Sequence, residues 1–201
     1  MARAAALPPD ERRAQLLAAA RSVFARQGYH RAGVADIVDA VGVARGTFYR
    51  YFESKRAVFQ VVLEQMMDEV VAVVQPIDVS APIVPQVVAN LERLVRAIMA
   101  EDVARVLFNE SVGIDAEGDD ALRAFYGEAL ARIERALLTG QALGVVEPGD
   151  VAIRARCLLG MLKEPVTQAR LFGDDLEPDR LVAELAGLLG RGLLGDASSR
   201  G

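Results

Sequence analysis

The sequence has one cysteine and one histidine among 201 residues, so it has few of the residues that form metal sites and disulfide bonds. It also has no tryptophan. The single cysteine, Cys157, excludes a disulfide within one chain and is typical of a reducing compartment. One imidazole and one thiol are too few for a zinc site built from nitrogen and sulfur ligands. We therefore expect neither a metal site nor a cofactor.

Long apolar runs are also absent. No segment approaches the ~18 apolar residues of a membrane span, and Met1 to Pro9 holds no apolar stretch of signal-peptide length. These absences predict a soluble, cytoplasmic protein with no membrane partner. Hydrophobic residues still make up 52% of the chain, and a chain of this length buries roughly 70% of its unfolded surface. The sequence therefore predicts a folded protein of one or two domains.

The net charge of -5 conceals two segments of opposite sign. Residues 1–56 hold ten basic and five acidic side chains, whereas the remainder holds 13 basic and 23 acidic ones. The first segment therefore carries +5 and the rest -10. Such an asymmetry favours a basic segment that meets a polyanion, and chance clustering is the alternative that charge alone leaves open.

Helical periodicity runs through almost the whole chain, and strand alternation is nearly absent. Glycine or proline separates most of the periodic segments, which predicts an all-α fold. The expected helices span about 9–27, 34–41, 44–52, 54–75, 83–100, 102–113, 119–143, 150–172 and 178–194. We expect a three-helix head with a helix-turn-helix over residues 1–53, followed by a helical bundle over residues 54–201.

Residues 28–55 carry the most informative pattern. It comprises Gly-Tyr at 28–29, Gly-Val at 42–43, Gly-Thr-Phe-Tyr-Arg-Tyr-Phe at 46–52 and Ser-Lys at 54–55. This pattern resembles the DNA-binding signature of the TetR family of bacterial transcriptional regulators, over roughly Leu16 to Phe59. The resemblance implies a DNA-binding head on a second domain that dimerises and holds a small molecule.

The third helix of the head is the expected recognition helix. Arg45 can bind guanine bidentately, Thr47 can contact a phosphate or a thymine methyl, and Gly46 leaves room for the backbone to approach the duplex. Phe48 and Phe52 are expected to pack inward. The predicted DNA-binding residues are Ala44, Arg45, Gly46, Thr47, Tyr49, Arg50, Tyr51 and Lys55.

Lys55 and Arg56 begin a helix, where cations oppose the macrodipole. A phosphate bound at that helix start would remove the conflict, and the resemblance implies a phosphate contact for Lys55. Two solvated surface charges are the alternative. The sequence departs from the family pattern at Ala44, where serine is common, and at Gly33, where threonine or serine is usual. These departures affect the expected affinity and operator sequence rather than the DNA-binding role.

The C-terminal bundle holds methionine and aromatic residues that could line a ligand cavity. Ordinary core packing is the alternative for each of them. The predicted ligand-binding residues are Met66, Met99, Phe108, Asn109, Phe125, Tyr126 and Met161.

Repeated glycines beside leucine pairs in the last helix predict a close approach by another helix. We expect a homodimer through this helix and helix 150–172, because a two-fold dimer places two recognition helices on a palindromic operator. Cys157, beside Leu158 and Leu159, is expected to be a small core residue rather than a redox sensor.

The predicted function is ligand-responsive, sequence-specific binding of double-stranded DNA. The regulator is expected to be a repressor that a small apolar or amphipathic molecule releases from its operator, and the sequence does not identify that effector. A helical protein-interaction adaptor without specific DNA binding is the alternative. An enzyme is not expected, because His30 lacks a partner motif and the carboxylates of residues 115–120 miss the calcium-loop spacing.

Overall fold

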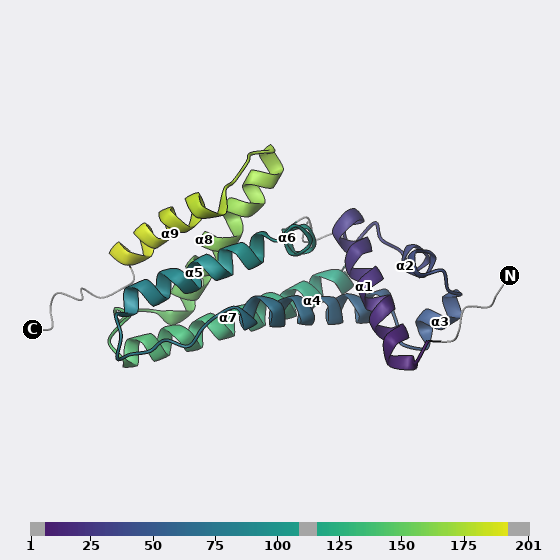
Figure 1. The fold of residues 1–201 in the computed structure, drawn as a ribbon, viewed down its shortest axis with the longest axis horizontal. Coiled ribbons are helices and arrows are strands. Elements are labelled where there is room, and N and C mark those ends of the chain that lie inside the picture. Colours follow the sequence, from purple (N-terminus) through teal and green to yellow (C-terminus); the bar gives the residue numbers. More distant parts are fainter. Residues whose placement is uncertain (1–6, 109–115, 193–201) are drawn as a thin grey trace, which may run out of the picture. The chain divides into compact units, whose positions relative to one another are not determined.

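The computed structural model describes residues 7–108 and 116–192, and within them it holds nine helices and no β-strand (Figure 1). The all-α fold class predicted from the sequence is confirmed. None of the described helices is long and apolar enough to cross a bilayer. The helices are α1 (Pro9–Gln27), α2 (Val34–Val41), α3 (Arg45–Tyr49), α4 (Lys55–Ala72), α5 (Ile83–Met99), α6 (Glu101–Phe108), α7 (Ala116–Ala142), α8 (Val151–Phe172) and α9 (Pro178–Gly192).

Local chemistry sets the helix ends. α1 and α2 end at Gly28 (φ 77°) and Gly42 (φ 72°), in the left-handed region that glycine adopts without strain. The hydroxyl of Ser54 accepts a hydrogen bond from the Ala57 N–H at 3.0 Å and so caps α4. The third helix is shorter than expected, because the N–H groups of residues 51 and 52 both donate to the carbonyl of Phe48 and close a turn.

The first compact unit comprises residues 1–66 and 101–122, described here over 7–66, 101–108 and 116–122. Its core contains three aromatic rings, with centroids 5.9 Å apart for Phe24 and Tyr29, 5.0 Å for Phe24 and Phe59, and 4.5 Å for Tyr29 and Phe59. All three side chains are essentially buried. Because Phe59 belongs to α4, these contacts make the beginning of α4 part of the helix-turn-helix head.

α6 belongs to the same unit and packs against α1. The guanidinium of Arg21 on α1 lies 2.6 Å from the carboxylate of Asp102 on α6, and the Arg21 side chain is 22% exposed. The compact unit therefore extends beyond the helix-turn-helix motif on which the predicted boundary at residue 53 was based. The division of roles at that boundary remains a prediction.

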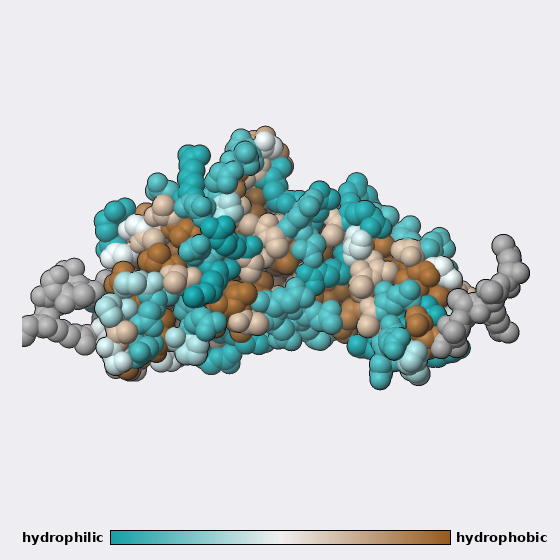
Figure 2. Space-filling model, viewed as in Figure 1, coloured by the Kyte–Doolittle hydropathy of each residue, from teal (hydrophilic) through white to brown (hydrophobic). Residues whose placement is uncertain are grey.

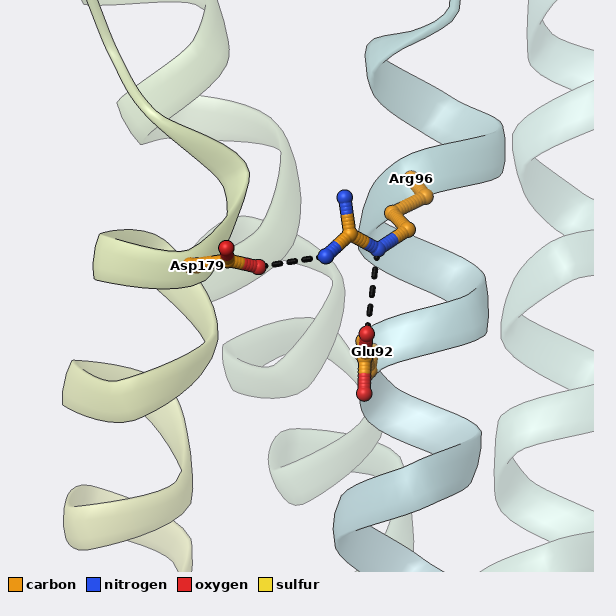
Figure 3. Close-up of polar contacts among 3 residues, drawn as sticks. All are labelled: Glu92, Arg96 and Asp179. Atoms are coloured by element: carbon orange, nitrogen blue, oxygen red, sulfur yellow. Dashed lines mark hydrogen bonds and ion pairs between the residues drawn. The ribbon is translucent and has the colours of Figure 1, made fainter.

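The second unit comprises residues 67–100 and 123–201, described here as far as residue 192. α5 and α9 pack against each other, and the guanidinium of Arg96 on α5 lies 2.5 Å from the carboxylate of Asp179 on α9 (Figure 3). Within α5, the same guanidinium lies 3.1 Å from the carboxylate of Glu92. The two carboxylates raise the pKa of Arg96, Glu92 having the larger effect. On the face seen in Figure 2, several apolar patches lie among hydrophilic side chains.

We predict that Phe59→Ala lowers the free energy of unfolding of the first unit by about 3–5 kcal/mol, because it removes a fully buried ring and leaves a cavity against Phe24 and Tyr29. Urea unfolding followed by circular dichroism at 222 nm measures the change. Tyr49→Ala is the control, since this ring is 47% exposed and its loss should change stability by less than about 0.5 kcal/mol. An equally small effect of Phe59→Ala would contradict the account of the core.

Candidate nucleic-acid interface and ligand cavity

In the helix-turn-helix, α3 has one buried face and one exposed face. Phe48 and Phe52 are 0% and 4% exposed, which confirms that they pack inward. Their ring centroids lie 5.6 Å apart, and the guanidinium of Arg13 on α1 lies 5.2 Å from the centroid of the Phe52 ring. These contacts fix the rotation of α3, so that its polar residues face outward.

The outward face of α3 carries most of the predicted DNA-binding residues. Ala44, Arg45, Gly46, Tyr49 and Arg50 are exposed, and Thr47 and Tyr51 are half-buried. A guanidinium nitrogen of Arg45 donates to the Tyr49 hydroxyl at 3.4 Å, and the guanidinium carbon lies 5.8 Å from the Tyr49 ring centroid. A cation and a phenol one helical turn apart therefore share one exposed surface.

Two glycines of the head differ in what surrounds them. A Cβ added at Gly46 would meet no described atom within 4 Å, so the packing of the head does not require glycine there. At Gly33 the backbone N–H donates to Asp36 Oδ2 at 2.7 Å, and an added Cβ would lie 3.2 Å from that oxygen. The Asp36 carboxylate thus accepts a hydrogen bond from the backbone N–H of Gly33 at the start of α2. Gly33 is the position at which the family pattern has a threonine or serine.

Lys55 has a partner within the head. Its ammonium donates to the carbonyl of Tyr29 at 2.9 Å and lies 4.1 Å from the centroid of the Tyr29 ring. Arg56 pairs with Asp120 at 3.7 Å. These contacts offset the unfavourable position of both cations at the start of α4, so the helix dipole no longer argues for a bound phosphate. An ammonium has three donors, and Tyr29 takes one of them.

The second unit contains a cavity of about 610 Å³. Its wall consists mainly of aliphatic side chains from α5, α7, α8 and α9, together with the segment that follows α4. The described lining residues are Val74, Gln75, Ile77, Ile83, Val87, Asn90, Leu91, Leu94, Ile133, Arg135, Ala136, Leu137, Thr139, Gly140, Leu143, Val145, Val146, Leu158, Met161, Leu162, Leu185 and Leu189.

The predicted ligand-binding set and this wall share Met161. Met66 is fully buried in the first unit, and Met99, Phe125 and Tyr126 are half-buried outside the described wall. The side chains predicted at Phe108 and Asn109 lie outside the described residues. Asn90 was missed, although an asparagine among Val87, Leu91 and Leu94 interrupts the apolar stripe of α5.

The prediction that Cys157 is a core residue is wrong, because its thiol is exposed. α8 contributes Leu158, Met161 and Leu162 to the described wall, and Cys157 is not part of that wall. Ile153 and Leu171 of the same helix are 60% and 75% exposed.

The model of the bacterial regulatory proteins of the tetR family matches residues 16–62, which hold the helix-turn-helix and the aromatic core of the head. Residues 16–62 therefore form a DNA-binding head of the TetR family. The transcriptional activator FasR of Mycolicibacterium smegmatis is 46% identical over 66 residues, which are 33% of this chain and 30% of that protein. The HTH-type regulator YfiR of Bacillus subtilis is 27% identical over 85% of both chains.

Solved structures show that this likeness extends to the whole fold. A TetR-family regulator from Syntrophomonas wolfei superposes with a TM-score of 0.77 at 19% identity, over 92% of this chain and 97% of its own. The fatty acid degradation regulator FadR from Bacillus halodurans gives 0.73 at 24% identity, over 90% and 95%. This protein is a DNA-binding transcriptional regulator, and the comparisons do not support the alternative of an adaptor.

Burial raises the pKa of Tyr126 to about 12. A folded-state pKa above the unfolded value of about 10 contributes stability that is complete below pH 10 and is lost as the pH rises from 10 to 12. We predict that the free energy of unfolding falls between pH 9 and pH 11.5 by about 2 kcal/mol more in the wild type than in Tyr126→Phe. Urea titrations at both pH values measure this difference, and equal losses would contradict the assignment.

Proposed function

We propose that this regulator is a dimeric repressor whose heads bind a palindromic operator and which a small apolar or amphipathic molecule releases. The observation that carries the proposal is the path of α4. Its first half packs in the head around Phe59, and the chain that follows its end, from Val74 to Ile77, lines the cavity. One helix therefore takes part in both the DNA-binding unit and the unit with room for a ligand.

We assign DNA contacts to the outward face of α3 and to Lys55. Arg45 supplies a guanidinium for a guanine edge, and Tyr49, Tyr51 and Thr47 supply hydroxyl groups for phosphates or bases. Lys55 retains donors for a phosphate beyond its bond to Tyr29. Ala44 and Gly46 leave the start of α3 without bulky side chains, which favours close approach to the duplex.

The cavity is the proposed effector site. Its volume falls in the range of about 300–1,000 Å³ that is usual for small-molecule sites, and its aliphatic wall suits an apolar body. Structural relatives include proteins named as fatty acid regulators, from Clostridium perfringens and Bacillus halodurans. A chain-like apolar molecule is therefore the first class of effector to examine.

Asn90 connects the cavity wall to the end of α4. Its side-chain oxygen accepts from the Gln75 N–H at 2.8 Å, and its amide nitrogen donates to the Gln75 carbonyl at 2.8 Å. Asn90 is buried, and both residues line the cavity. A ligand that shifts this wall therefore acts on the chain directly after α4, and typical coupling of this kind amounts to about 1–3 kcal/mol.

The exposed face of α8 and the glycines of α9 favour dimerisation. Ile153, Leu171 and Phe172 are 60%, 75% and 69% exposed, and a Cβ added at Gly160 or Gly190 would meet no described atom within 4 Å. Large exposed apolar side chains beside open backbone suit close packing with a second copy. Such a dimer would act in the cytoplasm and present two recognition helices to one operator.

We predict that Arg45→Ala combined with Tyr49→Ala weakens binding to an operator duplex, selected from random DNA, by about a hundredfold, since each base contact contributes about 1–3 kcal/mol. Fluorescence anisotropy measures the affinity. Arg180→Ala is the matched control, because it removes one exposed cation from α9. Unchanged affinity in the double variant would reject α3 as the recognition helix, and affinity that stays flat between about 50 and 200 mM salt would reject phosphate-dominated binding.

We predict that Ile153→Asp converts the dimer into a monomer, because the substitution places a charge in the proposed apolar interface. Leu138→Asp on α7 is the matched control, since Leu138 is 53% exposed and lies away from α8 in sequence. Sedimentation equilibrium gives the mass of each variant, and labelling of Cys157 should be slow in the dimer and fast in the monomer. A dimeric Ile153→Asp protein with a fully reactive Cys157 would refute this interface.

A further inference from the structure

We infer that the effector carries an anionic group which the guanidinium of Arg135 binds at the edge of the cavity. The inference rests on the proposed function, in which the cavity of the second unit holds the effector. It begins with the ionisable groups of the wall. Among the described lining residues Arg135 is the one ionisable side chain, and no carboxylate lies in the wall beside it.

Two neutral polar side chains of the wall, Asn90 and Thr139, form hydrogen bonds within the protein. Asn90 binds the backbone of Gln75 with both ends of its amide, and its oxygen also accepts from Arg93 at 3.0 Å. The hydroxyl of Thr139 donates to the carbonyl of Arg135 at 3.0 Å. A ligand that relied on Asn90 would have to compete with these internal hydrogen bonds.

The Arg135 guanidinium differs from its neighbours in having no ion-pair partner in the described parts of the chain. Arg132, less than one turn earlier on α7, pairs with Glu128 at 2.6 Å, and Arg96 pairs with Glu92 and Asp179. Arg135 is exposed, so water hydrates its charge while the cavity is empty. An anion at this position would replace water with charge-assisted hydrogen bonds.

The placement of Arg135 on α7 also fits an amphipathic molecule. Ile133, Ala136, Leu137 and Gly140 form the apolar stripe that α7 contributes to the wall, and Arg135 also lines the cavity from this helix, outside that stripe. An apolar body can therefore occupy the aliphatic part of the cavity while its anionic end remains near water. A cationic end would meet the like charge of Arg135. The molecules that fit this arrangement carry a carboxylate, sulfate or phosphate monoester on an apolar body.

The experiment compares two probes with the same apolar chain, dodecanoate and dodecan-1-ol, on the full-length protein. Each probe displaces the neutral fluorophore N-phenyl-1-naphthylamine at concentrations below micelle formation. Arg135→Gln should weaken dodecanoate about tenfold, the order expected for a charge-assisted hydrogen bond near water. The same substitution should change the affinity for dodecan-1-ol by less than about twofold, equivalent to under half a kcal/mol.

Arg132→Gln is the matched control, because it removes the same charge from the same helix outside the described wall. It should change neither affinity. Equal effects of Arg135→Gln on both probes, or no effect on dodecanoate, would overturn the inference while leaving the cavity as an effector site. Failure of the fluorophore and of both probes to bind the wild type would instead overturn the proposed effector site, and the inference with it.

Discussion

The packing of Phe59 against Phe24 and Tyr29 is the contact on which the account of this protein depends. It makes the start of α4 a structural part of the DNA-binding head, and Lys55 adds a hydrogen bond to the Tyr29 carbonyl. The head therefore consists of more than the three helices of its motif. Any displacement of the first turns of α4 must act on Phe24 of α1 and on Tyr29, because closely packed aromatic cores do not deform continuously.

The chain after α4 is held in a different way. There, Asn90 provides a buried polar clamp for Gln75 within a mainly aliphatic wall. Leaving such buried groups unpaired costs about 1–3 kcal/mol, so the clamp favours a defined position of this segment over a range of loose ones. A ligand changes the equilibrium only as far as it binds one arrangement of the wall more tightly than another. The cavity and the clamp share residues, which gives the ligand a direct means of making that distinction.

The helices and the inward face of α3 could be predicted from the sequence, because 3.6-residue periodicity and the helix ends at Gly28 and Gly42 are local signals. The sequence was not sufficient where the outcome depends on tertiary packing. The partner of Lys55 is Tyr29, 26 residues earlier, and no spacing rule connects them. Likewise, an apolar residue of α5 or α7 looks the same in sequence whether it lines a cavity or fills a core. For this reason, most of the predicted ligand set differs from the described wall, with which it shares Met161. For the same reason, Cys157 was expected in the core and is exposed.

The most direct test of the central claim is to let the full-length protein select duplexes from a random pool and to sequence those that remain bound. A dimer that reads DNA with α3 should enrich a palindrome whose half-site centres lie about one helical turn, or a multiple of it, apart. The enrichment should also decline when a molecule that fills the cavity is present. A pool that shows no enrichment, or a single motif without two-fold symmetry, would contradict the account.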